Sequence, residues 1–439
     1  MSGKRKELGF ITLISIVISS QLGSGAFFLP AQLAPFKTVG LFGWLVSVAG
    51  AISLALVFSD LSSHLPKNGG PHVYVTEAFG RVAGFFTAWL YWIISWSSNS
   101  VLLVTALGYL TILTGKLGSF ETFAIEAIIL FSITYINIVG MKFSGKIEIF
   151  LTMFKILPLI FLPIVFFMFF DPSFFKISLK EGAQVGDVLT TISKTALLTF
   201  WGFIGVECAT TPAQSVKNPQ KTIPRAIIIG TSCVALVYLM NTVSITGVVG
   251  FEKLEGAAAP YAIVMNSIFA NYSDVLISML ATIVCVGTLN AWTLTSGQIA
   301  YGAYEDGLFP KIFGKTNKSG APKAALLIAA FGILPFLALE QFEQGGLGKL
   351  IDMLVSVFIF VYLVCCISYM KLIKKWYGAN KKKKIRSQLL AQFSAIFCIF
   401  TLSQDLISSI IVLLIFISVG IPVFLKYKNT IKNTLIIED

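Results

Sequence analysis

Charged side chains are scarce in this chain of 439 residues. Asp, Glu, Lys and Arg make up only 12% of the sequence, whereas 56% of the residues are hydrophobic. A soluble domain carries about 25% charged residues, so this composition excludes an ordinary water-soluble globular protein. Apolar runs of about 20 residues recur along the whole length, which is enough to cross a hydrocarbon core about 30 Å thick. The sequence therefore predicts an all-α, multi-pass membrane protein.

Residues typical of catalytic and metal sites are also few. The chain holds two histidines and six cysteines, and every cysteine lies inside an apolar run without the spacing of metal ligands. The sequence lacks the metalloprotease HExxH and the esterase G-x-S-x-G motifs, and it lacks the phosphate-binding loop of ATPases. We therefore predict that the protein is not an enzyme and uses no cofactor and no metal. Any transport would be driven by gradients.

The net charge of +12 comes from basic residues in short loops between apolar runs, a position that orients a membrane protein and does not indicate a nucleic-acid partner. If the N-terminus is cytoplasmic, cytoplasmic segments carry 25 of the 33 Lys and Arg residues and external loops carry seven. This asymmetry predicts a plasma-membrane protein (the inner membrane in a bacterium) contacting membrane lipids, with both termini cytoplasmic. Twelve spans are expected at about 10–33, 39–63, 82–113, 121–139, 147–170, 191–212, 225–250, 277–304, 324–340, 350–371, 387–403 and 406–425.

Two similar glycine-containing stretches interrupt spans 1 and 6. "GSGAFFLPAQ" begins at Gly23 and "GVECATTPAQ" begins at Gly205. Five spans separate the two starts, so the stretches cross the membrane in opposite senses, as in transporters built from inverted repeats. We expect one transmembrane domain over residues 1–425, with repeats at about 10–170 and 191–371, extra helices at about 387–425, and a cytoplasmic tail at 426–439.

Glycine lowers the cost of non-helical backbone, and amides freed at the start of a half-helix attract a carboxylate. Freed backbone groups are tolerated in a bilayer only where they are buried in protein or line a wet cavity. Gly23, Ser24 and Gly25 are therefore candidates to bind the carboxylate of an amino acid. Close helix packing through small residues remains an alternative interpretation of the same glycines.

Four further motifs give the chain a family resemblance: "LYWIISWSSN" from Leu90, "WGFIGVE" from Trp201, "VKNPQKTIP" from Val216 and "DGLFPKIFGKTNKSGAP" from Asp306. With them the chain resembles the amino acid–polyamine–organocation (APC) permeases, specifically the bacterial basic amino acid/polyamine antiporters such as the arginine/agmatine and ornithine/putrescine exchangers. The resemblance implies the 5+5 inverted-repeat fold with broken helices 1 and 6 and two added helices. It implies an amino acid or polyamine substrate, and it leaves a homodimer open.

The resemblance also implies roles for individual residues. Ser24 and the backbone of Gly23 and Gly25 would bind the substrate α-carboxylate, and carbonyls from Trp201 to Ile204 would bind the α-amino group. Trp201 would be an aromatic gate, and Trp292 would line the pocket for the long side chain of the substrate. The other implied positions are pocket or gating positions at Tyr91 and Asn99, a tyrosine near the cytoplasmic gate at Tyr74, and a span-10 position at Ser356. The chain departs from some relatives at Ser20, which replaces Asn, and at Gln21, Ser95 and Ser98, which are polar.

Two of the charged residues inside predicted spans, Glu207 and Lys155, are candidates for a function. A mid-span carboxylate such as Glu207 costs about 2.5–3.5 kcal/mol on insertion scales and usually faces a cavity or a partner. We expect Glu207 to hold or sense a cationic substrate, with a proton-coupling role; a buried carboxylate satisfied by freed backbone is the alternative. Lys155 resembles a lysine that occupies the place of sodium in some sodium-independent members of the superfamily, and its buried amine could exchange a proton.

The sequence thus favours secondary active exchange of a basic amino acid (arginine, ornithine or lysine) for another amino acid or its diamine. Lys155 favours an alternative, a proton-coupled amino acid symporter of broader or neutral specificity. A channel would need a continuous pore lined by rings of polar groups, and two single helix breaks fit alternating access better.

Overall fold

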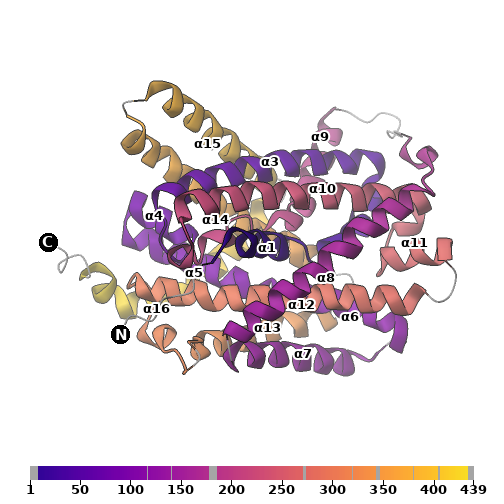
Figure 1. Cartoon of the computed structure of the whole chain (residues 1–439), viewed down its shortest axis with the longest axis horizontal. Helices are drawn as coiled ribbons and strands as arrows, with labels where there is room; N and C mark the ends of the chain where they lie inside the picture. The colour runs from indigo at the N-terminus through magenta and orange to yellow at the C-terminus, as the bar shows by residue number, and fades with distance from the viewer. Residues whose placement is uncertain are drawn as a thin grey trace.

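The computed structural model describes residues 8–115, 117–139, 141–176, 185–269, 273–318, 320–342, 347–378, 380–403 and 406–433. Within these ranges the regular structure is helical, apart from one isolated bridge between Leu8 and Val216. The long helices lie roughly side by side along one direction, with the short α1 in the middle of the bundle (Figure 1).

Helices of the first half are α1 (Phe10–Gln21), α2 (Gly25–Leu33), α3 (Lys37–His64), α4 (Pro71–Phe79), α5 (Arg81–Ser97), α6 (Asn99–Thr114), α7 (Ser119–Val139) and α8 (Met141–Phe167). Those of the second half are α9 (Val185–Phe200), α10 (Pro219–Leu254), α11 (Pro260–Phe269), α12 (Ser273–Glu305), α13 (Lys323–Phe342), α14 (Leu347–Trp376), α15 (Lys381–Leu402) and α16 (Leu406–Asn433). Short 3₁₀ helices lie at Ala34–Phe36, Pro172–Phe175, Trp201–Phe203, Cys208–Thr210, Ala213–Ser215 and Lys311–Gly314.

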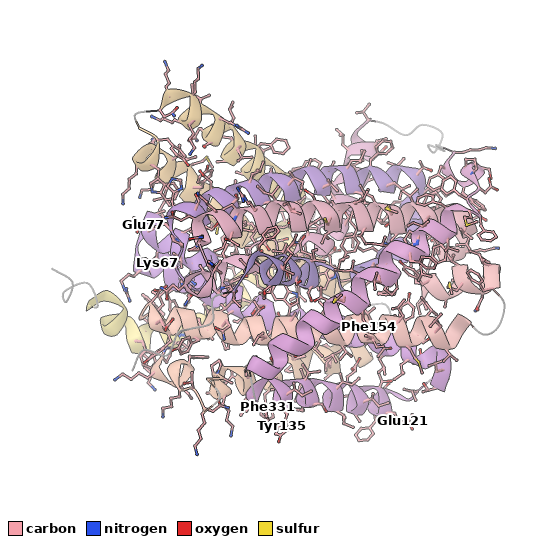
Figure 2. All side chains as sticks on the ribbon, in the orientation of Figure 1. Lys67, Glu77, Glu121, Tyr135, Phe154 and Phe331 are labelled. Atoms are coloured by element: carbon pink, nitrogen blue, oxygen red, sulfur yellow. The ribbon has the colours of Figure 1, made fainter. Side chains whose placement is uncertain are left out.

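Ten helical stretches among the described residues are long and apolar enough to cross a membrane. The first of them, Phe10–His64, contains α1, α2 and α3 together. Large apolar side chains such as Phe154 and Phe331 are more than half exposed and point outward from the flank of the bundle, whereas Lys67 and Glu77 lie at one end (Figure 2). An apolar flank with charged ends is what a bilayer requires, and the multi-pass membrane prediction is confirmed at this level.

Small residues let helices of the two halves approach closely. α3 packs against α9 at Gly43, where an added Cβ would lie only 2.3 Å from Thr195 Oγ1. One turn further, Ser47 Oγ donates to the Ala196 carbonyl at 2.7 Å. Since lipid is as apolar as leucine, such close backbone approaches and interhelical hydrogen bonds are what hold membrane helices together. These contacts hold α9 against α3, and the second interrupted segment begins where α9 ends.

Two predicted spans differ from continuous rods. The span expected at 82–113 consists of two helices, α5 and α6, which meet at Ser98. The expected span at 191–212 is α-helical only up to Phe200, and residues 201–215 form 3₁₀ turns and irregular backbone. Gly205, between the first two 3₁₀ turns of this segment, has φ +103°, a conformation that other residues rarely adopt.

Candidate substrate-binding site

The first helix break lies between Gln21, the last residue of α1, and Gly25, the first residue of α2. The Phe27 and Phe28 amides of the first turn of α2 donate to the Ser24 carbonyl, at 2.8 and 3.2 Å. The N-terminal end of α2, which carries partial positive charge, is directed at the break and would attract an anion there. The carbonyls at the end of α1 are capped by side chains from neighbouring helices. The caps are Trp292 Nε1 on the Ser20 carbonyl (3.0 Å), Tyr238 Oη on the Gln21 carbonyl (2.7 Å) and Thr288 Oγ1 on the Leu22 carbonyl (3.0 Å). These three carbonyls at the break therefore each have a hydrogen-bond donor.

The second break follows α9 and touches the first one. Ile204 is extended, and the left-handed Gly205 follows it. The Gly205 carbonyl accepts a hydrogen bond from Ser20 Oγ at 3.2 Å, and a Cβ at Gly205 would lie 2.8 Å from the same oxygen. The sequence therefore places both interruptions correctly, and the fold brings them into direct contact.

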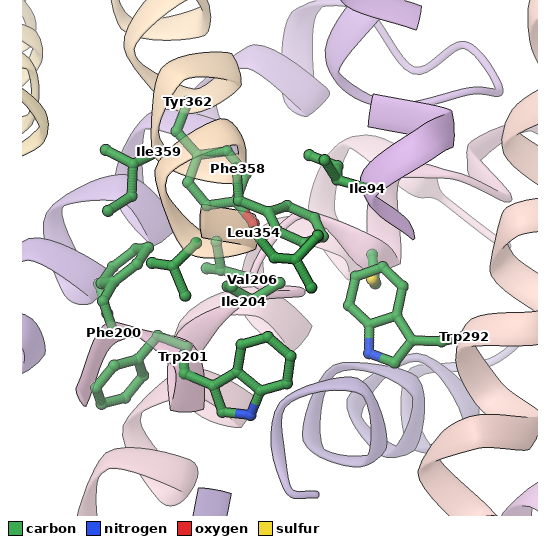
Figure 3. Close-up of a cluster of buried hydrophobic side chains, with 14 of the residues drawn as sticks. Ile94, Phe200, Trp201, Ile204, Val206, Trp292, Leu354, Phe358, Ile359 and Tyr362 are labelled. Carbon is green, nitrogen blue, oxygen red and sulfur yellow. The ribbon is translucent and has the colours of Figure 1, made fainter. Parts of the chain in front are cut away.

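A cavity of about 20 Å³, about room for one water molecule, lies between the two breaks, so a bound amino acid would require the surrounding residues to move apart. Trp201 and Trp292 border this region, with Phe358 and Tyr362 of α14 nearby (Figure 3). Trp201 Nε1 donates to Ser24 Oγ at 3.3 Å, so the expected gate residue contacts the expected carboxylate-binding residue. The lining residues are Ser20, Gln21, Gly23, Ser24, Ser98, Leu102, Trp201, Ile204, Thr288 and Trp292.

Glu207 is fully buried but does not line this cavity. Tyr91 Oη donates to its Oε1 at 2.6 Å, and Tyr362 Oη donates to its Oε2 through a very short hydrogen bond. Tyr362 also accepts from the Gly205 amide at 3.3 Å, so the carboxylate is linked to the second break through one hydroxyl. Sequence reasoning missed Tyr362, because nothing local in the sequence connects a tyrosine of α14 with Glu207.

Lys155 is fully buried on α8 and lies behind the first break. Its Nζ donates to Ser19 Oγ at 2.8 Å and to Thr288 Oγ1 at 3.1 Å. Thr288 lines the cavity and also donates to the Leu22 carbonyl. The amine is therefore one side chain away from the cavity and is hydrogen-bonded to Ser19 of α1 and Thr288 of α12.

The remaining residues that the sequence predicted for the site differ in how they are placed relative to the cavity. Gly25 lies under Trp201, and a Cβ there would be 3.2 Å from the indole Cδ1. Asn99 Nδ2 contacts Thr293 Oγ1 at 3.5 Å, while its neighbour Ser98 lines the cavity. Tyr74 is buried and lies 6.3 Å from Phe58 between ring centroids, and Ser356 Oγ donates to the Asp352 carbonyl at 2.7 Å; neither lines the cavity. Leu102, Tyr238 and Thr288 are the other contacts that sequence reasoning missed.

A membrane-embedded helical bundle with two touching helix breaks and a small cavity between them defines a solute transporter. The chain belongs to the amino acid permease family, whose model matches residues 8–436. The family and the relatives below are transporters, so the prediction that the protein is not an enzyme is confirmed.

The curated relatives fall within the group that the sequence motifs indicated. A cadaverine/lysine antiporter of Escherichia coli (strain K12) is 30% identical over 349 residues, which cover 79% of this chain and 78% of the relative. A putative arginine/ornithine antiporter of Bacillus subtilis (strain 168) is 29% identical over 432 residues, covering 90% and 91%. The putrescine transporter PotE of Haemophilus influenzae is 27% identical over 387 residues, covering 88% of each chain. The APC resemblance is therefore confirmed.

Proposed function

We propose that the protein is a secondary active antiporter that exchanges a basic amino acid (arginine, ornithine or lysine) for another amino acid or its diamine by alternating access. The single observation that carries this proposal is the cavity between two touching helix breaks, lined by Ser24, Trp201 and Trp292. The substrates named for two relatives, lysine with cadaverine and arginine with ornithine, support the basic class.

The substrate carboxylate would bind at the first amides of α2 and at Ser24 Oγ. Helix N-termini carry partial positive charge, and at this depth no bulk water competes for those amides. The α-amino group would be held by carbonyls of the segment Trp201–Ile204, where the 3₁₀ turn gives way to extended backbone. Ser24 Oγ accepts from the indole N–H of Trp201 and would donate its own O–H to the carboxylate, which links bound substrate to the gate residue.

The proposal includes a membrane topology. We place α1 with α2, and α3, as separate spans, so that the chain crosses twelve times with both termini cytoplasmic and forms one domain over residues 1–425. Labelling of single introduced cysteines with an impermeant reagent in intact cells tests this. Sites in the loop at 251–259 would react from outside, whereas sites at 311–318 would react only after permeabilisation.

Counterflow in liposomes tests the exchange itself. Purified protein is reconstituted with unlabelled lysine, arginine or ornithine inside, and labelled substrate is added outside. Saturable accumulation that requires internal substrate is expected, and it should vanish with an empty lumen. Accumulation that is independent of internal substrate would contradict antiport.

Proton-coupled symport is a second candidate, and one observation favours it: the buried ammonium of Lys155, which bonds Ser19 and Thr288 beside the cavity. A buried amine is poised to release and regain a proton as its hydrogen-bond partners separate. Uptake into empty liposomes driven by an imposed pH gradient, and abolished by a protonophore, would support symport over exchange.

A further inference from the structure

Gln21 is the last residue of α1, lies directly before the first helix break and lines the cavity. Its side chain is buried, with the residue only 3% exposed. The amide Nε2 donates to Thr231 Oγ1 of α10 at 3.1 Å, which fixes one end of the amide group. The oxygen at the other end, Oε1, has no hydrogen-bond partner among the residues that the structure describes.

A buried acceptor without a donor is destabilising unless a ligand supplies one. The cavity offers no carboxylate among its described lining residues, so a positive charge on a substrate would have to be met by neutral acceptors and by aromatic rings. Trp201 and Trp292 supply two indole rings in the same cavity, and indole faces attract cations. Gln21 Oε1 is the acceptor that completes such a site.

We propose that Gln21 Oε1 accepts a hydrogen bond from the nitrogen at the far end of the substrate side chain, and that this contact selects amino acids with a terminal ammonium or guanidinium group over apolar ones of equal length. The inference rests on the proposed function, in which the backbone of the two breaks binds the α-carboxylate and the α-amino group. Lysine, ornithine and arginine carry additional N–H donors at the end of the side chain, and an apolar amino acid of equal length lacks them.

The test compares lysine with norleucine, which has the same carbon chain without the terminal ammonium. Affinities are measured on the purified full-length protein by the fluorescence of the cavity tryptophans and by competition in counterflow. Wild type should prefer lysine. Gln21→Leu, which keeps the volume and removes the acceptor, should lower the lysine-to-norleucine affinity ratio at least about tenfold, since a hydrogen bond to a charged group is lost.

Two variants keep the result interpretable. Gln21→Glu retains an acceptor oxygen and should restore or increase the preference for lysine. Gln32→Leu, the same substitution at a glutamine of α2 that does not line the cavity, should leave the ratio unchanged. If Gln21→Leu does not fold, Gln21→Met should show the same fall in the ratio.

Three results would overturn the inference: an unchanged ratio in Gln21→Leu, an equal loss of both ligands, or a wild type that binds norleucine as tightly as lysine. Failure of the proposed function looks different, because wild type would then show no saturable counterflow of any basic amino acid. A wild type that exchanges lysine while Gln21→Leu keeps its selectivity would refute the role of Gln21 alone.

Discussion

Replacing Tyr362 with phenylalanine tests the carboxylate network behind the cavity. The hydroxyl of Tyr362 donates to Glu207 Oε2 and accepts from the Gly205 amide, and all three groups are buried. Deleting it leaves one carboxylate oxygen and one backbone N–H without this partner. Hydrogen bonds to charged groups contribute about 1.5–3 kcal/mol, and an orphaned buried donor adds about 1–3 kcal/mol. We therefore expect Tyr362→Phe to be destabilised by about 2.5–6 kcal/mol.

The assay is thermal unfolding of purified protein in one detergent, followed by tryptophan fluorescence and by loss of the monodisperse peak. Tyr91→Phe removes only the 2.6 Å bond to Glu207 Oε1, so it should destabilise the protein less than Tyr362→Phe. The double variant should lose less than the two single losses added together, because both hydroxyls serve one carboxylate.

Tyr135→Phe is the matched control, because Tyr135 is 67% exposed on the flank of α7 (Figure 2). It should unfold like wild type. The reasoning would be refuted if Tyr362→Phe unfolded at the same temperature as Tyr135→Phe, since the hydroxyl would then contribute nothing to the second break.

Three further predictions follow from contacts at the breaks. Lys155→Met should remove the ammonium behind the cavity and lower the counterflow rate at least about tenfold, and any dependence on a pH gradient should disappear with it; a rate and a pH dependence equal to wild type would exclude a coupling role. Gly205→Ala should destabilise the protein by about 1–3 kcal/mol, because its φ is +103° and the new methyl meets Ser20 Oγ at 2.8 Å; thermal unfolding measures this, and wild-type stability would contradict it. Trp201→Phe keeps an aromatic ring but loses the indole N–H that contacts Ser24, so substrate should exchange faster and bind more weakly; slower exchange with unchanged affinity in stopped-flow fluorescence would argue against the gate.

The sequence predicted the helix breaks because their cause is local. Gly23 and Gly205 each begin a similar stretch that ends in Pro-Ala-Gln, and it is this repeated pattern that indicated the breaks, because a lone glycine such as Gly43 stays helical. The apolar runs themselves predicted the membrane-spanning class, since length and hydropathy alone decide whether a helix can cross a bilayer. These features need no knowledge of the neighbouring segments.

Tertiary partners could not be predicted in the same way. Tyr362 lies 155 residues from the carboxylate that it bonds, and Thr288 lies 133 residues from Lys155. Glu207 was expected beside the substrate, whereas the structure surrounds it with tyrosines outside the cavity lining. Such pairings arise from helix packing, which hydropathy does not encode.

Some residues that line the cavity also hold the backbone at the end of α1 through a hydrogen bond, and others do not. Thr288 and Trp292 each bond a carbonyl at the end of α1 and also line the cavity, so changing either one alters the backbone as well as the surface that a solute meets. Ser98 bonds a carbonyl of the preceding turn, and Leu102 is a purely apolar wall. Substitutions at Ser98 and Leu102 can therefore change solute preference without removing the hydrogen bonds that hold the end of α1.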